Sequence, residues 1–151
     1  MDKALQQRSG CELIAEVTGS FGEVCLKVTG SSMMPVIWPD DVITVQREMD
    51  DLQPGQIVLY RRGETLVAHR IVCVHEGFLI TRGDSLANDD PPIGEPDVVG
   101  RVTGIVRDGR CLHPSQSLWQ RAGSYVLQRS HLCLCMALHF RRLWREMAWA
   151  S

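Results

Sequence analysis

VTGSSMMP, residues 28–35, ends a run of alternating apolar and polar residues that begins at Glu23. Alternation with a period of two predicts a half-buried β-strand. Gly30 reaches backbone conformations that other residues resist, and Pro35 fixes its own φ, so the strand should end in a constrained turn. Such a turn presents the hydroxyl of Ser32. Because a serine is a weak nucleophile until a base takes its proton, catalysis there requires a base from elsewhere in the chain.

The composition predicts one globular domain with a core of its own. The chain has 151 residues, of which 44% are hydrophobic and 23% charged, and this balance excludes a disordered or fibrous protein. The first residues are too polar for a signal peptide, and no stretch reaches the ~20 apolar residues of a spanning helix. We therefore expect a cytoplasmic protein without an N-terminal membrane anchor.

The cysteines do not have the spacing of a metal site. None of the six belongs to a Cys-x-x-Cys pair, and Cys133 and Cys135 would point about 200° apart on a helix. Cys25 and Cys73 lie in apolar, strand-like runs, where a free and buried thiol is expected. The pattern predicts a reducing compartment, and we expect neither a metal nor a cofactor.

Short apolar runs separated by turn residues predict a mainly β fold, with antiparallel sheets arranged like a barrel. Pro54-Gly55 and Glu76-Gly77 are typical turn pairs, and Gly100 and Gly104 are candidates for bulges or bends in the last strand. The loop 83–96 is rich in Asp, Asn, Gly and Pro. After Glu23–Thr29 the expected strands are Val42–Val45, Gln56–Tyr60, Thr65–Val74, Phe78–Thr81 and Val98–Arg107.

The two ends of the chain differ from this β body. Residues 1–15 could form a short helix, and residues 115–148 have apolar residues at helical spacing. Residues 110–151 carry six arginines against one acid, while the rest of the chain is net acidic. We expect an N-terminal segment (1–20), a β domain (21–110) and a basic helical tail (111–151). The tail either packs on the β body or lies on a membrane surface or a partner.

Three segments carry the residue types of an acyl-transfer site. Ser32 lies in the turn, His69 lies in the middle of an expected strand, and Asp84 and Asp90 lie in the acidic loop that follows another strand. A serine, a histidine and an aspartate on separate elements are the parts of such a site. Each part alone has a plainer explanation: strand histidines are often structural, and aspartates in such loops usually stabilise turns.

Taken in order, these segments resemble the type I signal peptidase and LexA-type superfamily of serine peptidases. Val28–Pro35 is similar to its nucleophile motif, and Asp40-Asp41 to its glycine-aspartate turn, with Asp40 where glycine is typical. His69–Val72 and the acidic box Thr81–Asp84, with Asp90-Pro91 after it, resemble the archaeal and endoplasmic-reticulum branch, in which histidine replaces the lysine base. The resemblance spans about residues 20–107 and implies coiled, antiparallel β-sheets of the type found in signal peptidases and the LexA C-terminal domain.

The resemblance also implies roles for single residues. Ser32 would be the nucleophile and His69 the general base, since an imidazole with an ordinary pKa near ~6.5 accepts a proton at neutral pH. Asp90 is the first choice to orient His69. Asp84 is the second choice, or it anchors the loop.

The oxyanion site and the substrate pocket follow from the same resemblance. The Ser32 backbone N–H would be one oxyanion donor. Many signal peptidases have a serine where this chain has Gly30, so the second donor is open between Ser31 and Thr29. The substrate would be an extended peptide or leader sequence with small residues before the cut. Met33 and Ile37 either line its pocket or simply belong to the core.

Two differences from known members of this superfamily reduce the number of functions that we expect. The residues before Ser32 hold neither a membrane anchor nor room for a DNA-binding helix-turn-helix, and no Ala-Gly or Cys-Gly bond precedes Ser32 for self-cleavage. We therefore expect a serine endopeptidase that acts on peptide or protein substrates, with no nucleic-acid partner. One alternative is a weak or inactive peptide-binding module on the same fold. A metal site from the histidines and aspartates is disfavoured, because the loop lacks the calcium-binding pattern.

Overall fold

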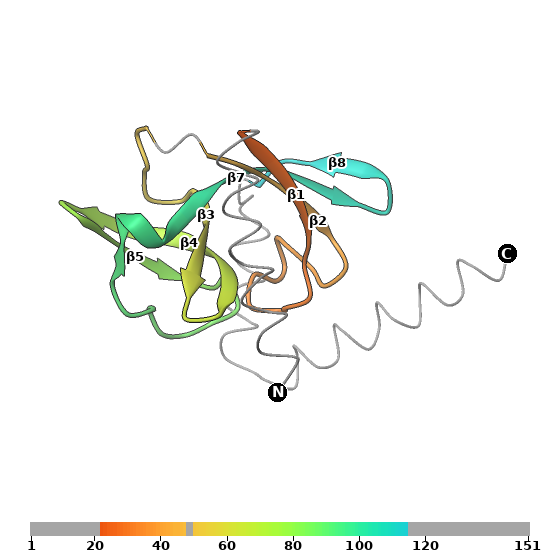
Figure 1. Ribbon diagram of the computed structural model, residues 1–151. Helices are drawn as coiled ribbons and strands as arrows, with labels where there is room; N and C mark the ends of the chain where they lie inside the picture. Colours follow the sequence, from red (N-terminus) through yellow and green to blue (C-terminus); the bar gives the residue numbers. More distant parts are fainter. Residues whose placement is uncertain (1–21, 48–49, 115–151) are drawn as a thin grey trace, which may run out of the picture.

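The computed structural model describes residues 22–47 and 50–114 (Figure 1). The expected N-terminal helix and nearly all of the basic helical tail lie outside these residues. The predicted division into three parts is therefore described only for its β domain. Within the described part, the eight strands are β1 (Glu23–Lys27), β2 (Val42–Gln46), β3 (Ile57–Arg62), β4 (Thr65–His75), β5 (Phe78–Arg82), β6 (Ile93–Gly94), β7 (Val98–Arg107) and β8 (Arg110–Leu112).

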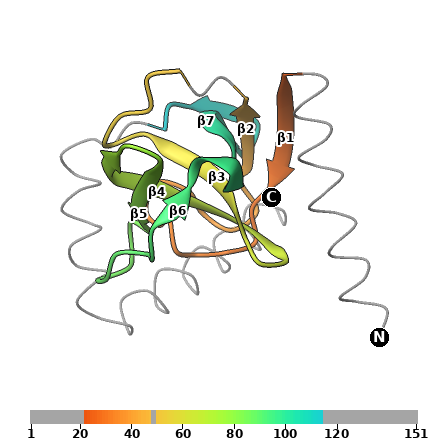
Figure 2. The same ribbon diagram turned by 60° about the vertical axis from the view of Figure 1, so that its left-hand side comes forward.

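All strand pairs are antiparallel, which confirms the predicted fold class. The strand order is β1-β2-β7-β3-β4-β5-β6, with β8 added beside β7. Figure 1 shows β4 and β5 on one side of the molecule, β2 and β8 on the other, and β3 and β7 between them. Figure 2 shows how strongly the sheet coils, because β1 and β2 stand at a steep angle to β3 and β4.

The central strand β3 is buried on both of its faces. Its residues Ile57 and Leu59 belong to one hydrophobic core, and Val58 and Tyr60 belong to a second core on the opposite face. Such a continuous apolar run is what a strand covered on both sides requires. The coiled sheet therefore encloses two cores, and β3 separates them.

The predicted strands are present, with ends that differ by one or two residues, and Val98–Arg107 has the predicted bounds. The short strands β6 and β8 were not predicted. They are too brief to show a periodic pattern. β6 lies inside the expected loop 83–96, and the 3₁₀ turn Glu95–Asp97 follows it across the end of that loop.

The burial expected for two cysteines is wrong. Cys25 is exposed and Cys73 is partly exposed. Along β1, Cys25 shares its outward phase with Glu23 and Lys27, while Val24 and Leu26 turn inward. The alternation in the sequence already puts Cys25 in the polar phase of this strand, so the expectation of burial followed the apolar character of the thiol instead of the strand pattern.

The glycines of β7 mark the predicted bends. The pairing of β2 with β7 shifts register next to Gly104, and the pairing of β3 with β7 shifts next to Gly100. A Cβ at Gly100 would collide with the backbone carbonyl of Gln46 on β2. β7 can therefore lie against both of its neighbours only because this position lacks a side chain.

A buried carboxylate closes the turn that carries Ser32. Asp41 has no exposed side-chain surface, and Arg107 of β7 binds it through Nε–Oδ1 (3.0 Å) and Nη2–Oδ2 (2.7 Å). The backbone N–H of Trp38 donates to the same carboxylate (2.8 Å), and Arg107 also donates to the carbonyl of Val36 (2.8 Å). The ion pair thus fixes the chain that follows Ser32, from Val36 to Asp41, to β7.

The residue before this carboxylate explains a departure noted in the sequence. Asp40 has φ 74°, in the left-handed region that glycine enters without strain and that aspartate tolerates better than most residues. Its carboxylate also pairs with Lys27 at 2.9 Å. Aspartate can therefore replace the glycine that is typical of this turn.

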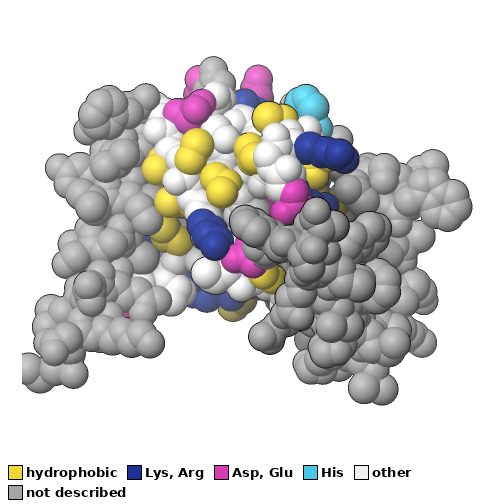
Figure 3. Space-filling view, turned by 90° about the vertical axis from the view of Figure 1, so that its right-hand side faces the viewer, with side chains coloured by type: hydrophobic (Ala, Val, Ile, Leu, Met, Phe, Trp, Pro, Cys, Tyr) yellow, Lys and Arg dark blue, Asp and Glu magenta, His cyan; other side chains and the backbone are white. Residues whose placement is uncertain are grey.

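The surface of the described part is mixed in character. Figure 3 shows single apolar side chains among charged side chains of both signs on the face turned to the viewer. Val74, Leu86 and Leu112 are the large exposed hydrophobic residues of the described part. Within the same residues, no helix is long and apolar enough to cross a membrane.

The Asp41–Arg107 pair gives a stability prediction. Asp41→Ala removes the acceptor that Arg107 and the Trp38 N–H share, so we expect a loss of about 2–4 kcal/mol in the free energy of unfolding, measured in urea. The control is Asp97→Ala, which removes an exposed carboxylate 3.9 Å from Arg61 and should cost less than about 0.5 kcal/mol. Equal effects of the two variants would contradict the anchoring role of Asp41.

Candidate active site

Apolar side chains hold the Ser32 turn in place. Met33, Met34, Val36 and Ile37 are all at least 97% buried, and they follow Ser32 directly in the chain. The turn closes with backbone hydrogen bonds from Met34 N to Ser31 O (3.1 Å) and from Ile37 N to Met33 O (2.9 Å). Burying these side chains leaves the hydroxyl of Ser32 at the edge of the core.

The hydroxyl of Ser32 lies within hydrogen-bond distance of His69. The Ser32 Oγ–His69 Nε2 distance is 2.9 Å, although 37 residues separate the two in the chain. His69 lies in the middle of β4, pairs with Val58 of β3 and is 97% buried. The structure therefore brings the first two predicted site residues into contact.

Asp90 and Asp84 have different partners. Asp90 Oδ2 lies 2.6 Å from His69 Nδ1, on the side of the ring opposite Ser32. Asp84 instead forms a two-point ion pair with Arg70, with Oδ1–Nε and Oδ2–Nη2 distances of 2.8 Å each. Of the two predicted acids, only Asp90 contacts the histidine, whereas Asp84 anchors its loop to β4.

The surroundings of Asp90 keep its carboxylate ionised. Burial raises the pKa of Asp90, but the hydrogen bonds from His69, Arg62 and Thr81 outweigh it, so the pKa lies below its usual range. An ionised carboxylate only accepts hydrogen bonds, so His69 Nδ1 must carry the proton. In the neutral imidazole, the lone pair on Nε2 then faces Ser32 and can accept its hydroxyl proton.

The loop that carries Asp84 also fixes the backbone of Ser32. The Ser85 N–H donates to the carbonyl of Ser32 (2.9 Å), and Ser85 Oγ donates to it at 3.0 Å. A Cβ at Gly83 would lie 2.7 Å from the same carbonyl oxygen, closer than real Cβ contacts. The approach of this loop therefore orients the Ser32 peptide and requires glycine at position 83.

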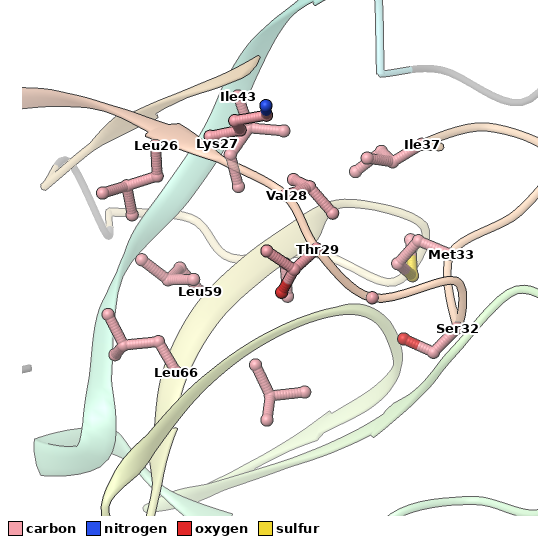
Figure 4. Close-up of a pocket in the computed structure, with 13 residues that line it drawn as sticks. Leu26, Lys27, Val28, Thr29, Ser32, Met33, Ile37, Ile43, Leu59 and Leu66 are labelled. Carbon is pink, nitrogen blue, oxygen red and sulfur yellow. The ribbon is translucent and has the colours of Figure 1, made fainter. Parts of the chain in front are cut away.

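A pocket of about 400 Å³ opens beside Ser32 (Figure 4). Figure 4 shows side chains from β1, β3, the start of β4 and the Ser32 turn around it. Met33 and Ile37 line it while they are also buried in the first core. Its lining residues are Leu26, Lys27, Val28, Thr29, Gly30, Ser32, Met33, Ile37, Ile43, Leu59, Leu66, Val67 and Ala68.

The other residues considered for the oxyanion site are Thr29, Gly30 and Ser31. Thr29 and Gly30 line the pocket, and a Cβ built on Gly30 would meet nothing within 4 Å. The carbonyl of Ser31 accepts hydrogen bonds from Met34 N and from Ser85 Oγ. The backbone around Ser32 is therefore well held, and Gly30 leaves open space where a side chain would fit.

Sequence reasoning missed the residues that surround Asp90. Thr81 Oγ1 donates to Asp90 Oδ2 (2.7 Å), the Tyr60 hydroxyl donates to it (3.2 Å), and Arg62 Nη2 pairs with Oδ1 (2.7 Å). One signal could have placed Tyr60. The turn at Gly63 pairs Arg62 with Thr65. Continuing this antiparallel register away from the turn places Tyr60 diagonally next to His69.

The residues of the disfavoured metal site are engaged elsewhere. His69 contacts Ser32 and Asp90, Asp84 pairs with Arg70, and Asp89 pairs with Arg82 at 3.3 Å. Among residues 22–47 and 50–114, no three metal-ligating side chains come together.

The coiled antiparallel β-sheet is the architecture expected for the serine peptidase superfamily that the sequence resembles, and it brings a serine, a histidine and an aspartate into contact. The family model described as Peptidase S24-like matches residues 4–100. This match covers more than half of the chain, so the chain belongs to the Peptidase S24-like family, which includes serine peptidases. No curated protein matches the chain.

The lowered pKa of Asp90 predicts a pH-dependent contribution to stability. The ionised group stabilises the fold fully above its unfolded pKa of 3.8, and this contribution disappears as the pH falls below 3.8 toward the lower folded value. Asp90→Asn should therefore be less stable than the wild type at about pH 5. The gap should shrink toward about pH 2.5, as measured by urea unfolding across this range.

Asp89→Asn is the matched control for this prediction. Asp89 is next to Asp90 in the chain, but its side chain is half-exposed and pairs with Arg82 at the surface. It should differ little from the wild type at any pH. A gap for Asp90→Asn that stays constant down to pH 2.5 would show that Asp90 is not held ionised.

Proposed function

We propose that the protein is a serine endopeptidase in which Ser32 is the nucleophile, His69 the general base and Asp90 the residue that orients the imidazole. The observation that carries the proposal is the unbroken chain of contacts Ser32 Oγ–His69 Nε2 (2.9 Å) and His69 Nδ1–Asp90 Oδ2 (2.6 Å). The histidine base and the acidic box favour a relation to the archaeal and endoplasmic-reticulum type of signal peptidase.

The chemistry follows from these contacts. Ser32 Oγ attacks the carbonyl carbon of the peptide while its proton moves to His69 Nε2. The imidazolium, stabilised by Asp90, then gives that proton to the leaving amine nitrogen as the C–N bond breaks. Water attacks the resulting acyl-enzyme in the same way, with its proton again passing through His69, and releases the acid product.

The backbone N–H of Ser32 is the proposed oxyanion donor. The two hydrogen bonds from Ser85 to the Ser32 carbonyl hold the peptide group that follows Ser32, which limits how the nucleophile's backbone can turn. Donors that are fixed before reaction stabilise the developing charge without reorganisation.

The substrate proposal rests on the pocket beside Ser32. Its lining is mainly aliphatic, so the side chain bound there should be apolar (Figure 4). β1 leads into the Ser32 turn and forms the end of the sheet, where an extended peptide can add main-chain hydrogen bonds. We infer an extended peptide segment with an apolar residue before the cut.

The proposal is tested by reaction with a fluorophosphonate probe, followed by peptide mapping in a mass spectrometer. We expect one adduct at Ser32 that disappears in Ser32→Ala and in His69→Ala, because the hydroxyl is reactive only when the base takes its proton. His75→Ala is the matched control, because this exposed histidine at the end of β4 lies outside the site, and it should still be labelled. Cleavage of a random peptide mixture should then show apolar residues before the cut.

Two results would contradict the proposal. Labelling that survives in His69→Ala would remove the histidine from the mechanism. Absence of labelling together with tight binding of extended peptides would instead support the alternative, a peptide-binding module without activity.

Gly30 offers a gain-of-function prediction. Its Cβ position is open and its φ is not in the left-handed region, so a side chain fits without strain. Gly30→Ser should add a second oxyanion donor and raise the second-order rate of Ser32 labelling by about tenfold, below the ~10²–10³ that an established donor is worth. Gly30→Ala is the control, and an equal rate for the two variants would show that the hydroxyl does not reach the oxyanion.

A further inference from the structure

Arg62 contacts the site from the end of β3. Its Nη2 atom lies 2.7 Å from Asp90 Oδ1 and 2.5 Å from the hydroxyl oxygen of Tyr60. The guanidinium carbon also lies 5.4 Å from the centre of the Tyr60 ring. The Arg62 side chain is 46% exposed whereas that of Asp90 is 7% exposed, so the arginine covers the carboxylate on its solvent side.

The two oxygens of Asp90 have separate tasks. Oδ2 accepts hydrogen bonds from His69, Thr81 and the hydroxyl of Tyr60, all of which are buried groups. Oδ1 forms the ion pair with Arg62. The cation therefore draws part of the carboxylate's charge away from the oxygen that faces the imidazole.

We propose that Arg62 is a positioning residue that balances the charge of Asp90 and thereby favours the neutral form of His69, which is able to act as a base. This inference rests on the proposed function. A buried carboxylate without a second partner would stabilise the imidazolium strongly, and the protonated ring could not take the proton of Ser32. The ion pair with Arg62 reduces that stabilisation while it still fixes the carboxylate.

The other charged and titratable groups around His69 do not take this role. Tyr60 faces it from β3, and burial, as the largest cause, raises the pKa of Tyr60, so the phenol stays neutral. Asp89, next to Asp90 in its loop, is paired with Arg82 at the surface. Arg70, next to His69 in β4, is held by Asp84.

The test is the pH dependence of Ser32 labelling by the fluorophosphonate probe. In Arg62→Met, we expect the acid limb of the second-order rate to move to higher pH by about 0.5–1 unit, because the carboxylate is then balanced by no cation. Arg62→Lys keeps the charge without the guanidinium geometry and should shift less. Arg61→Met is the matched control, since Arg61 is the next residue, is similarly exposed and lies near Asp97 instead.

The wild type provides a second test that needs no variant. Because Arg62 is half-exposed, about 0.5 M salt should screen its charge and move the acid limb in the same direction as Arg62→Met. The inference would be overturned if the acid limb of the labelling rate stayed at the same pH in both experiments. A rate that fell equally at every pH would not support it, because such a fall indicates only a loss of structure.

Titration of the His69 ring protons by NMR separates this inference from the proposed function. The midpoint should shift to higher pH in Arg62→Met whether or not Ser32 is labelled. A shift without any labelling would overturn the peptidase proposal and keep the charge-balancing contact. An unshifted midpoint in a well-folded variant would overturn the role of Arg62, while labelling of the wild type would keep the peptidase proposal.

Discussion

The register of the β3–β4 hairpin determines what each face of the sheet presents. Pairing Val58 with His69 places the histidine on the face of the second core, together with Tyr60. The same register places Leu59 and Ala68 on the opposite face, where they line the pocket. A slip of one residue would exchange the two faces, so the imidazole and the pocket are positioned by the same set of hydrogen bonds.

The site itself depends on hydrogen-bond and ion-pair partners for one buried carboxylate, that of Asp90. Asp90 is brought under the protein surface by its loop, and burial alone would favour its neutral form. Three donors besides His69 offset that cost: two come from β3, which is distant in the chain from the acidic loop, and one comes from β5, which leads directly into it. The neighbouring strands thus supply the polar contacts that allow an ionised group to lie next to the histidine.

The sequence allowed the fold class, most strands and the candidate residues Ser32, His69 and Asp90 to be predicted, because these depend on local periodicity and on ordered motifs. It did not allow the contacts of Tyr60, Arg62 or Ser85 to be predicted, since they arise from register and from the approach of loops far apart in the chain. The exposure of Cys25 was missed for a different reason, because the general burial of free thiols was given more weight than the alternation of the strand. Cys25 shares its phase with Glu23 and Lys27, and that charged phase of β1 faces outward.

The close approach at Gly83 has a consequence for engineering. The acidic loop touches the carbonyl of Ser32 at a point where even a methyl group would not fit, and Ser85 bonds to that carbonyl from the same loop. The nucleophile turn and the acidic loop therefore form one unit with a shared shape. Either loop taken from a relative should be exchanged together with the other, because a foreign loop alone would bring the wrong surface to this contact.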